Sequence, residues 1–318
     1  MSKSAKVSSG TAQARIRHNI PLYLMFLPGA IYLLINNYIP MAGLVIAFKQ
    51  VNWNKGILKS PWVGFSNFEY LFKTKEAWNI TRNTLGYNII FIILGTVIAI
   101  AVAILLNEIT SMMLKKTYQT VILLPYLISM VVVSYLVYAM LSSENGFVNL
   151  SILRPLGKQE ISWYTESKYW PAILIIIYIW KTFGYNCILY YATLVGIDRG
   201  YYEAAVIDGA SRWQTLWRVT IPNVMPSITI CTFLTLTNSF KLFDQNLALT
   251  GGQPFKIQPD GSAIKTTEML ALNIYNTFYG QNVNARGTAQ AKAVLFFLLV
   301  AAIGLIQLRA TRKKEVQQ

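Results

Sequence analysis

Long apolar runs without a charged side chain dominate the pattern along this chain. A bilayer core about 30 Å thick is crossed by a helix of about 20 mostly apolar residues. Runs of roughly that length predict membrane-spanning helices at 22–47, 85–106, 119–141, 170–194, 222–243 and 291–309. The sequence therefore predicts an all-α membrane protein with six transmembrane helices.

The first and last of these runs are less regular than the others. The first holds Pro28 and Pro40. It is too long for a signal peptide, so we expect a kinked span, which neighbouring groups in a membrane tolerate. The last run is short, and we expect Lys292 and Arg309 at its two ends to extend to the interfaces.

Composition supports the membrane assignment. The 318 residues are 54% hydrophobic and 13% charged, whereas soluble domains carry about 25% charged residues. The net charge of +15 would suggest nucleic acid in a polar protein, but here the basic residues separate apolar runs, so we expect no nucleic-acid partner. The single histidine, His18, argues against His-ligated metal sites and Ser-His-Asp catalysis. Cys187 and Cys231 lie in apolar runs, where we expect them to pack.

Six spans place both termini on one side of the membrane. Lys and Arg residues in the tails, 1–20 and 310–318, and at Arg309 indicate that this side is the cytoplasm. The loop at 49–84, which this orientation places outside, carries six basic residues and opposes the assignment. We expect a multi-pass protein of the cell membrane with a transmembrane domain at 21–309 and cytoplasmic tails.

The cytoplasmic segment 197–222 has the most distinctive pattern. Tyr201 to Ile207 suits a short helix, which Gly209 interrupts. Ser211 is a suitable N-cap for a second short helix, with Trp213, Leu216 and Trp217 on one face. The pattern fits an interfacial helix pair without a partner and a rigid docking element for a soluble partner about equally well.

This segment resembles the EAA loop of ABC importer permeases. The residues that carry the resemblance are Glu203-Ala204-Ala205, Asp208-Gly209-Ala210 and Ile221-Pro222. Further stretches resemble the carbohydrate branch of this family, including those paired with a second, homologous permease for oligosaccharides or polysaccharide fragments. They are Leu27-Pro28-Gly29, Trp62 to Phe68, Leu124-Pro125 and Leu249 to Pro254, although Gln253 interrupts the usual Gly-Gly-Pro run.

The resemblance implies a type I ABC importer permease fold and a mechanism. The loop would be the coupling helix that docks in a cleft of a cytoplasmic ATPase, whose ATP-driven closure alternates access across the membrane. The residues expected at that interface are Glu203, Ala204, Ala205, Asp208, Gly209, Ala210 and Arg212, with Glu203 facing a basic or amide group of the ATPase. The chain has no G-x-x-x-x-G-K-[ST] motif, so we expect no nucleotide cofactor on it and no enzymatic activity. The implied partners are a second permease, two ATPase subunits and an extracytoplasmic binding protein.

Polar residues inside spans four and five are candidates for the substrate route. A charge at mid-bilayer costs about 2.5–3.5 kcal/mol on insertion scales and often marks a pathway. Lys181 lies near the middle of span four, where a structural hydrogen bond to a neighbouring helix is an equally good explanation. Lys241 and Asp244 are spaced as an intrahelical ion pair. The full candidate set is Lys181, Tyr185, Asn186, Asn238, Ser239, Lys241 and Asp244.

Two other functions compete with an ATP-driven importer. An ion-coupled secondary sugar transporter would place acidic residues deep in its spans, and none of the predicted spans has one. A membrane enzyme would cluster carboxylates or histidines near an interface, whereas Glu144, Glu160 and Glu166 are scattered over one outer loop. The sequence leaves open which saccharide is carried and which of the two permeases holds a substrate site.

Overall fold

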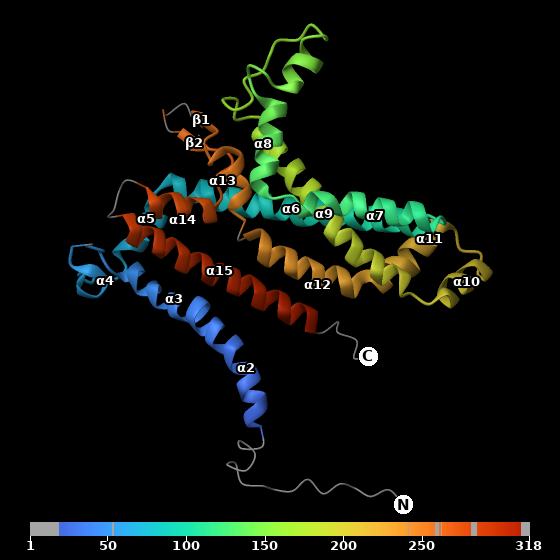
Figure 1. Ribbon diagram of the computed structural model, residues 1–318, viewed down its shortest axis with the longest axis horizontal. Coiled ribbons are helices and arrows are strands. Elements are labelled where there is room, and N and C mark those ends of the chain that lie inside the picture. The colour runs from blue at the N-terminus through green and yellow to red at the C-terminus, as the bar shows by residue number, and fades with distance from the viewer. Residues whose placement is uncertain are drawn as a thin grey trace, which may run out of the picture.

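The computed structural model describes residues 19–52, 54–240, 242–257, 261, 263–280 and 285–312. The side chains of 70–73 and 310–312 lie outside this description, as do Lys241 and all residues before Asn19. The described chain is mostly helical, and its helices form an elongated bundle with loops at both ends (Figure 1).

Five helical segments of the described residues are long and apolar enough to span a membrane. A sixth span is added if one bent helix pair is counted as a single span, which confirms the predicted fold class. The first span contains α2 (Ile20–Leu33), the π-helical turn η1 (Leu34–Tyr38), α3 (Ile39–Met41) and the 3-10 turn η2 (Ala42–Phe48). The other straight spans are α6 (Lys75–Glu108), α9 (Trp170–Val195), the continuous run of α11 (Arg212–Thr215), η4 (Leu216–Thr220) and α12 (Ile221–Phe240), and α15 (Arg286–Arg312).

The third span is not the single helix that the sequence predicted over 119–141. It is divided into α7 (Met112–Leu127) and α8 (Met130–Leu141), which meet at 94°. Pro125 weakens the last turn of α7 because it lacks an N–H group, and the Ser129 side chain caps α8 by accepting from the Val132 N–H at 3.3 Å. As a result, α8 leaves the bundle almost at a right angle (Figure 1).

The core of the bundle lies between α6 and α9, which share the most extensive packing of any two elements. Ala99 and Ala103 of α6 are fully buried there and allow close approach of the helices. Cys187 of α9 and Cys231 of α12 are buried, unbridged and packed in the same cluster, as expected from their apolar surroundings.

At the end of the bundle opposite α10 (Arg199–Ile207), short elements form a cap. They are α4 (Gly56–Lys59), α5 (Ser66–Lys73), β1 (Phe255–Ile257), β2 (Ala263–Lys265) and α14 (Leu270–Tyr279), and the loop after α8 contains η3 (Val148–Leu153). The strands pair antiparallel, with Phe255 opposite Lys265. The sequence did not predict this hairpin. The helix α13 (Asp244–Thr250) packs on α8.

The expectation that Lys292 reaches the membrane interface was wrong. Its residue exposure is only 3%, and its Nζ donates to Asn273 Oδ1 at 2.7 Å and Thr277 Oγ1 at 3.1 Å. Both acceptors belong to α14, which packs on α15. Lys292 therefore links α14 of the cap to the last span, a contact that a hydropathy pattern does not indicate.

Candidate coupling surface and membrane pathway

The helix α10 is bounded by specific capping interactions. The Asp198 side chain caps its start by accepting from the Gly200 N–H at 2.9 Å. At its end, Gly209 has a φ of +71°, a conformation that side-chain-bearing residues rarely adopt, and the Ala210 N–H returns to the Ala205 carbonyl at 2.9 Å. The predicted break at Gly209 is confirmed.

The second helix of this segment differs from the prediction of a separate interfacial helix. Ser211 caps α11 as predicted, within a reciprocal capping box: its N–H donates to Gln214 Oε1 at 2.8 Å, and its Oγ accepts from the Gln214 N–H at 3.3 Å. However, α11 continues through η4 into α12 without an interruption. The segment is therefore one short helix, α10, attached by a glycine turn to the extended end of the fifth span.

Two contacts hold α10 against its own chain. Ala205 is buried, so its small side chain serves the packing of α10 on the fifth span. The Tyr202 hydroxyl lies 3.3 Å from Thr220 Oγ1 in η4. Between α10 and the start of the fifth span lies a hollow of about 380 Å³, whose lining includes Ala204, Gly209 and Arg218.

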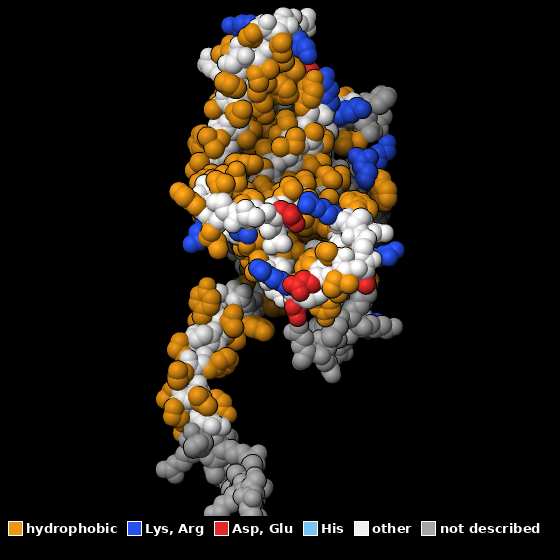
Figure 2. All heavy atoms as spheres, turned by 90° about the vertical axis from the view of Figure 1, so that its right-hand side faces the viewer, with side chains coloured by type: hydrophobic (Ala, Val, Ile, Leu, Met, Phe, Trp, Pro, Cys, Tyr) orange, Lys and Arg blue, Asp and Glu red, His pale blue; other side chains and the backbone are white. Residues whose placement is uncertain are grey.

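The outer face of α10 is exposed and partly apolar. Val206 and Ile207 are 74% and 85% exposed, and Glu203, Ala204 and Asp208 are also exposed. Figure 2 views this end of the molecule and shows acidic and basic side chains gathered on it, whereas hydrophobic side chains cover the arm above. Arg212, at the first position of α11, lines a neighbouring hollow of about 590 Å³ together with Glu108 and Trp213. All seven candidate coupling residues thus lie in α10, the turn that follows it and the first position of α11.

In span four, Lys181 is engaged with the broken third span. Its Nζ donates to the carbonyl oxygens of Pro125 at 3.4 Å and Tyr126 at 3.3 Å, and also to that of Ile128. These are carbonyls at the C-terminal end of α7, where a helix lacks internal donors and where a positive charge is favourable. The structural hydrogen bond that the sequence left open for Lys181 is therefore present.

Tyr185 and Asp244 lie close to this junction. The Tyr185 ring stacks on Tyr126 with centroids 4.8 Å apart. Asp244 begins α13, is exposed, and its carboxylate acts electrostatically on the Lys181 ammonium. Of the candidate pathway residues, the structure thus brings together Lys181, Tyr185 and Asp244.

The remaining candidates are arranged differently. Ser239 is buried, and its hydroxyl donates within its own helix to the Leu236 carbonyl at 3.2 Å. Asn238 is exposed and Asn186 half-buried. Lys241 lies outside the described residues, so its ion pair with Asp244 stays a prediction. The sequence analysis missed two contacts between α7 and α9. One is the stack of Tyr126 on Tyr185, and the other is the close approach of Gly184 to the Ile122 backbone.

The described residues contain no group of three or more His, Cys, Asp or Glu side chains that could hold a metal ion. The chemistry available at the two sites is therefore that of hydrogen bonds, aromatic rings and surface charge.

Comparison with known proteins places these features in a family. Residues 92–315, more than half of the chain, match the family described as the binding-protein-dependent transport system inner membrane component. The chain belongs to this family. This permease is 31% identical over 308 residues to the probable starch degradation products transport system permease protein AmyD of Thermoanaerobacterium thermosulfurigenes, covering 95% of this chain and 97% of AmyD. It is 34% identical to the polygalacturonan/rhamnogalacturonan transport system permease protein YteP of Bacillus subtilis (strain 168), over 70% of this chain and 68% of YteP.

Solved structures agree with the sequence comparison. The permease superimposes with a TM-score of 0.82 and 30% identity on a chain of a bacterial ABC transporter that imports the acidic polysaccharide alginate, covering 96% of this chain and 99% of the other. A second structure, of the alginate transporter with a periplasmic protein bound to an alginate pentasaccharide, gives a TM-score of 0.81. The predicted carbohydrate branch of the ABC importer permeases is confirmed, and this family decides against the ion-coupled transporter. The chain is a transport subunit with several membrane-spanning helices.

Proposed function

We propose that this permease forms half of a translocation pathway for an oligosaccharide or polysaccharide fragment, delivered by an extracytoplasmic binding protein. The other half would be a homologous second permease. The proposal is supported by the relatives, whose names specify starch products, polygalacturonan and alginate. ATP hydrolysis would reside on two separate ATPase subunits, because no nucleotide-binding motif occurs in this sequence.

The coupling surface of this proposal is α10 with the turn that follows it. The observation that carries it is the form of α10: its outer face exposes Val206 and Ile207, while its inner face is fastened through Ala205 and Tyr202. An apolar helix face that is exposed yet rigidly attached suits docking in a groove of a partner. In this arrangement Glu203, Ala204, Asp208 and Arg212 surround the contact, and Gly209 sets the angle at which α10 projects.

The same proposal fixes the orientation in the membrane. An ATPase is cytoplasmic, so α10 lies inside, and both tails lie inside as well. The loops around α5, α14 and the strand pair then face outward, where the binding protein docks. Polar residues around Lys181 and Asp244, together with Asn186, Asn238, Ser239 and Lys241, lie along the route, with Lys181 acting mainly as a helix-end ligand.

The test compares two substitutions of exposed apolar residues at opposite ends of the molecule. Ile207→Asp changes the proposed docking face, and Leu156→Asp introduces the same carboxylate at an exposed position near the turn after η3. We expect Ile207→Asp to lose co-purification of the ATPase and uptake, while the complex of the two permeases stays intact. Leu156→Asp should retain the ATPase.

A second matched pair tests the turn. Gly209 and Gly157 both have positive φ, at +71° and +65°, with open space where a Cβ would lie. Gly209→Val should uncouple uptake from ATP hydrolysis, and Gly157→Val should not. Retained ATPase binding and uptake in both Ile207→Asp and Gly209→Val would overturn the proposed coupling surface.

A further inference from the structure

An aromatic hollow lies where α8 leaves the bundle, away from Lys181 and away from α10. Its volume is about 420 Å³, within the range of about 300–1,000 Å³ typical of small-ligand sites. One side is a single stripe of α8 at helical spacing, and the other comes from α13 and the loop after η3. The lining residues are Val131, Ser134, Tyr135, Tyr138, Tyr164, Ala248 and Leu249.

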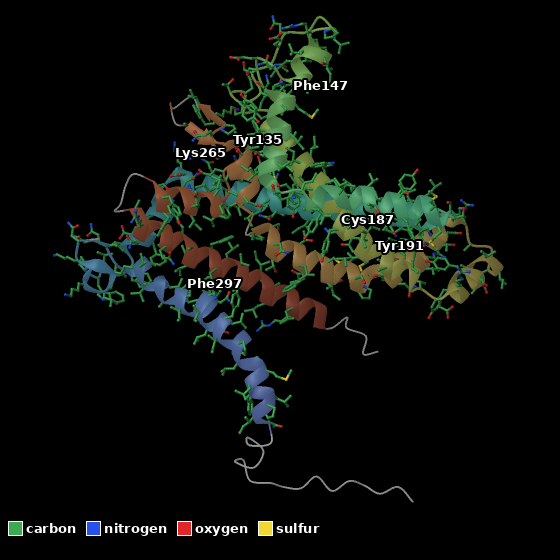
Figure 3. The ribbon with its side chains drawn as sticks, in the orientation of Figure 1. Tyr135, Phe147, Cys187, Tyr191, Lys265 and Phe297 are labelled. Atoms are coloured by element: carbon green, nitrogen blue, oxygen red, sulfur yellow. The ribbon has the colours of Figure 1, made fainter. Side chains whose placement is uncertain are left out.

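Two of the three tyrosines of this hollow are exposed. Tyr135 and Tyr138 are 72% and 57% exposed, although they lie beside well-packed elements. Figure 3 labels Tyr135 on α8, below Phe147 on the same arm.

The third tyrosine is held rigidly. The Tyr164 ring contacts Tyr138 at 5.7 Å and the buried Trp170 at 5.0 Å. Trp170 Nε1 donates to the Trp163 carbonyl at 2.8 Å, which fixes this loop against α9. Burial, followed by the neighbouring Tyr138, raises the pKa of Tyr164, so its phenol remains a neutral hydrogen-bonding group.

The chemistry of the lining selects one class of ligand. None of the seven lining residues, all within the described chain, carries a charge, so the hollow offers flat rings, hydroxyl groups and aliphatic side chains. Ring faces that stack, combined with hydroxyls that both donate and accept, suit the apolar faces and hydroxyl rims of sugar rings. The lining offers no cation, so a ligand is held there through its ring faces and hydroxyl groups and not through a negative charge.

Two further exposed tyrosines lie near the break in the third span. The exposed Tyr126–Tyr185 stack stands at the start of the break from which α8 departs, next to Lys181. Exposed tyrosines thus occur on both sides of this break, from the α8 arm to the middle of span four.

We propose that Tyr135, Tyr138 and Tyr164 form an outer saccharide subsite, which receives a sugar ring of the incoming chain before it reaches the residues around Lys181. This inference rests on the proposed function, since it takes the transported oligosaccharide as its ligand. The subsite binds by stacking, so it tolerates different sugars and favours chains long enough to reach from α8 to Tyr185.

The experiment uses the complete transporter in proteoliposomes with its binding protein. Uptake is measured for short oligosaccharides of starch, polygalacturonan and alginate in the wild type, Tyr135→Leu, Tyr138→Leu, Tyr135→Phe and Tyr135→Trp. The control Tyr118→Leu removes an exposed tyrosine of α7 outside the hollow. We expect the two leucine variants to raise KM about tenfold through the loss of a ring contact, with kcat and ATPase co-purification little changed.

The aromatic replacements separate stacking from general disruption. Tyr135→Phe should stay within about threefold of the wild-type KM because the ring is kept. Tyr135→Trp should retain uptake and change its fluorescence on addition of the transported saccharide. Unchanged KM in both leucine variants would overturn the subsite, as would loss of the second permease from the purified complex, because the face would then be a subunit contact. If the wild type transports no saccharide of the panel, the saccharide assignment of the proposed function fails, and the subsite fails with it.

Discussion

The contact between α7 and α9 depends on the absence of a side chain at Gly184. A Cβ added there would lie 2.6 Å from the Ile122 carbonyl carbon and closer still to its oxygen. Both atoms are backbone, so no change of rotamer relieves the overlap. Gly184→Ala therefore requires the two helices to move apart by more than about 1 Å, because the contact with the oxygen is the shorter of the two.

The magnitude follows from the packing that this separation removes. A gap of about 0.5–1 Å forfeits a quarter to a half of each dispersion contact, and overpacking a core costs about 1–3 kcal/mol. Alanine regains about 0.5–1 kcal/mol in helix propensity. We expect a net destabilisation of about 0.5–2 kcal/mol. Uptake should also fall, because Lys181 and Tyr185, on either side of Gly184, bind the same end of α7.

The matched control is Gly95, another buried glycine within a span, where an added Cβ meets nothing within 4 Å. Gly95→Ala should be neutral or slightly stabilising. The assay is thermal denaturation of the purified complex, followed by size-exclusion chromatography, with uptake measured in parallel. If Gly184→Ala melted and transported like Gly95→Ala, the close backbone contact would not exist in the assembled transporter.

Three further substitutions test the buried polar contacts. Lys181→Met should cost about 1–2 kcal/mol, because the carbonyls at the end of α7 lose a charged donor that is partly exposed, whereas Lys181→Arg should retain most stability in the same melting assay. Lys292→Met should lower stability by about 1–3 kcal/mol, because it leaves the buried Asn273 Oδ1 without its Lys292 donor, and it should make the α14 region more sensitive to protease. Its control, Lys256→Met at an exposed position, should change neither property. Asn149→Ala should accelerate proteolysis of the loop after α8. Asn149 is fully buried, its amide donates to the Ile161 carbonyl and its Oδ1 accepts from the Trp163 indole, both at 2.9 Å. Its control, Asn145→Ala at an exposed position, should leave the rate of proteolysis unchanged. Equal behaviour of a variant and its control would contradict the corresponding contact.

The spans and the turn at Gly209 could be predicted because each rests on a local signal. An apolar run of the required length is sufficient for a span, and a glycine followed by Ser211 is sufficient for a helix end and a new start. The break in the third span also had local signals, Pro125 and Ser129, but proline is tolerated inside membrane helices. Only the Lys181 contacts to the freed carbonyls show why this chain breaks there instead of bending.

Other features depend on residues far apart in the sequence. Lys292 was expected at the interface because it lies at the end of the last apolar run. Its acceptors, Asn273 and Thr277, belong to a different element, so the sequence pattern did not show that it would be buried. The β1–β2 hairpin lies in a loop without alternating apolar positions, and its position is set by bonds such as that from Tyr87 to the Thr266 carbonyl at 2.8 Å. Such long-range pairs leave no periodic pattern in the sequence.

The fifth span is one continuous helix from Arg212 to Phe240, which begins at the proposed coupling surface. The Tyr202 hydroxyl of α10 contacts Thr220 of this helix, so a displacement of α10 would act directly on the first part of the span. Beyond the other end of the span, α13 is held to α9 by the buried Gln245, whose amide donates to the Leu174 carbonyl at 2.9 Å. If α10 receives movement from an ATPase, as we propose, we expect that movement to affect the residues around Lys181 before the cap, because the Asp244 carboxylate at the start of α13 acts electrostatically on Lys181.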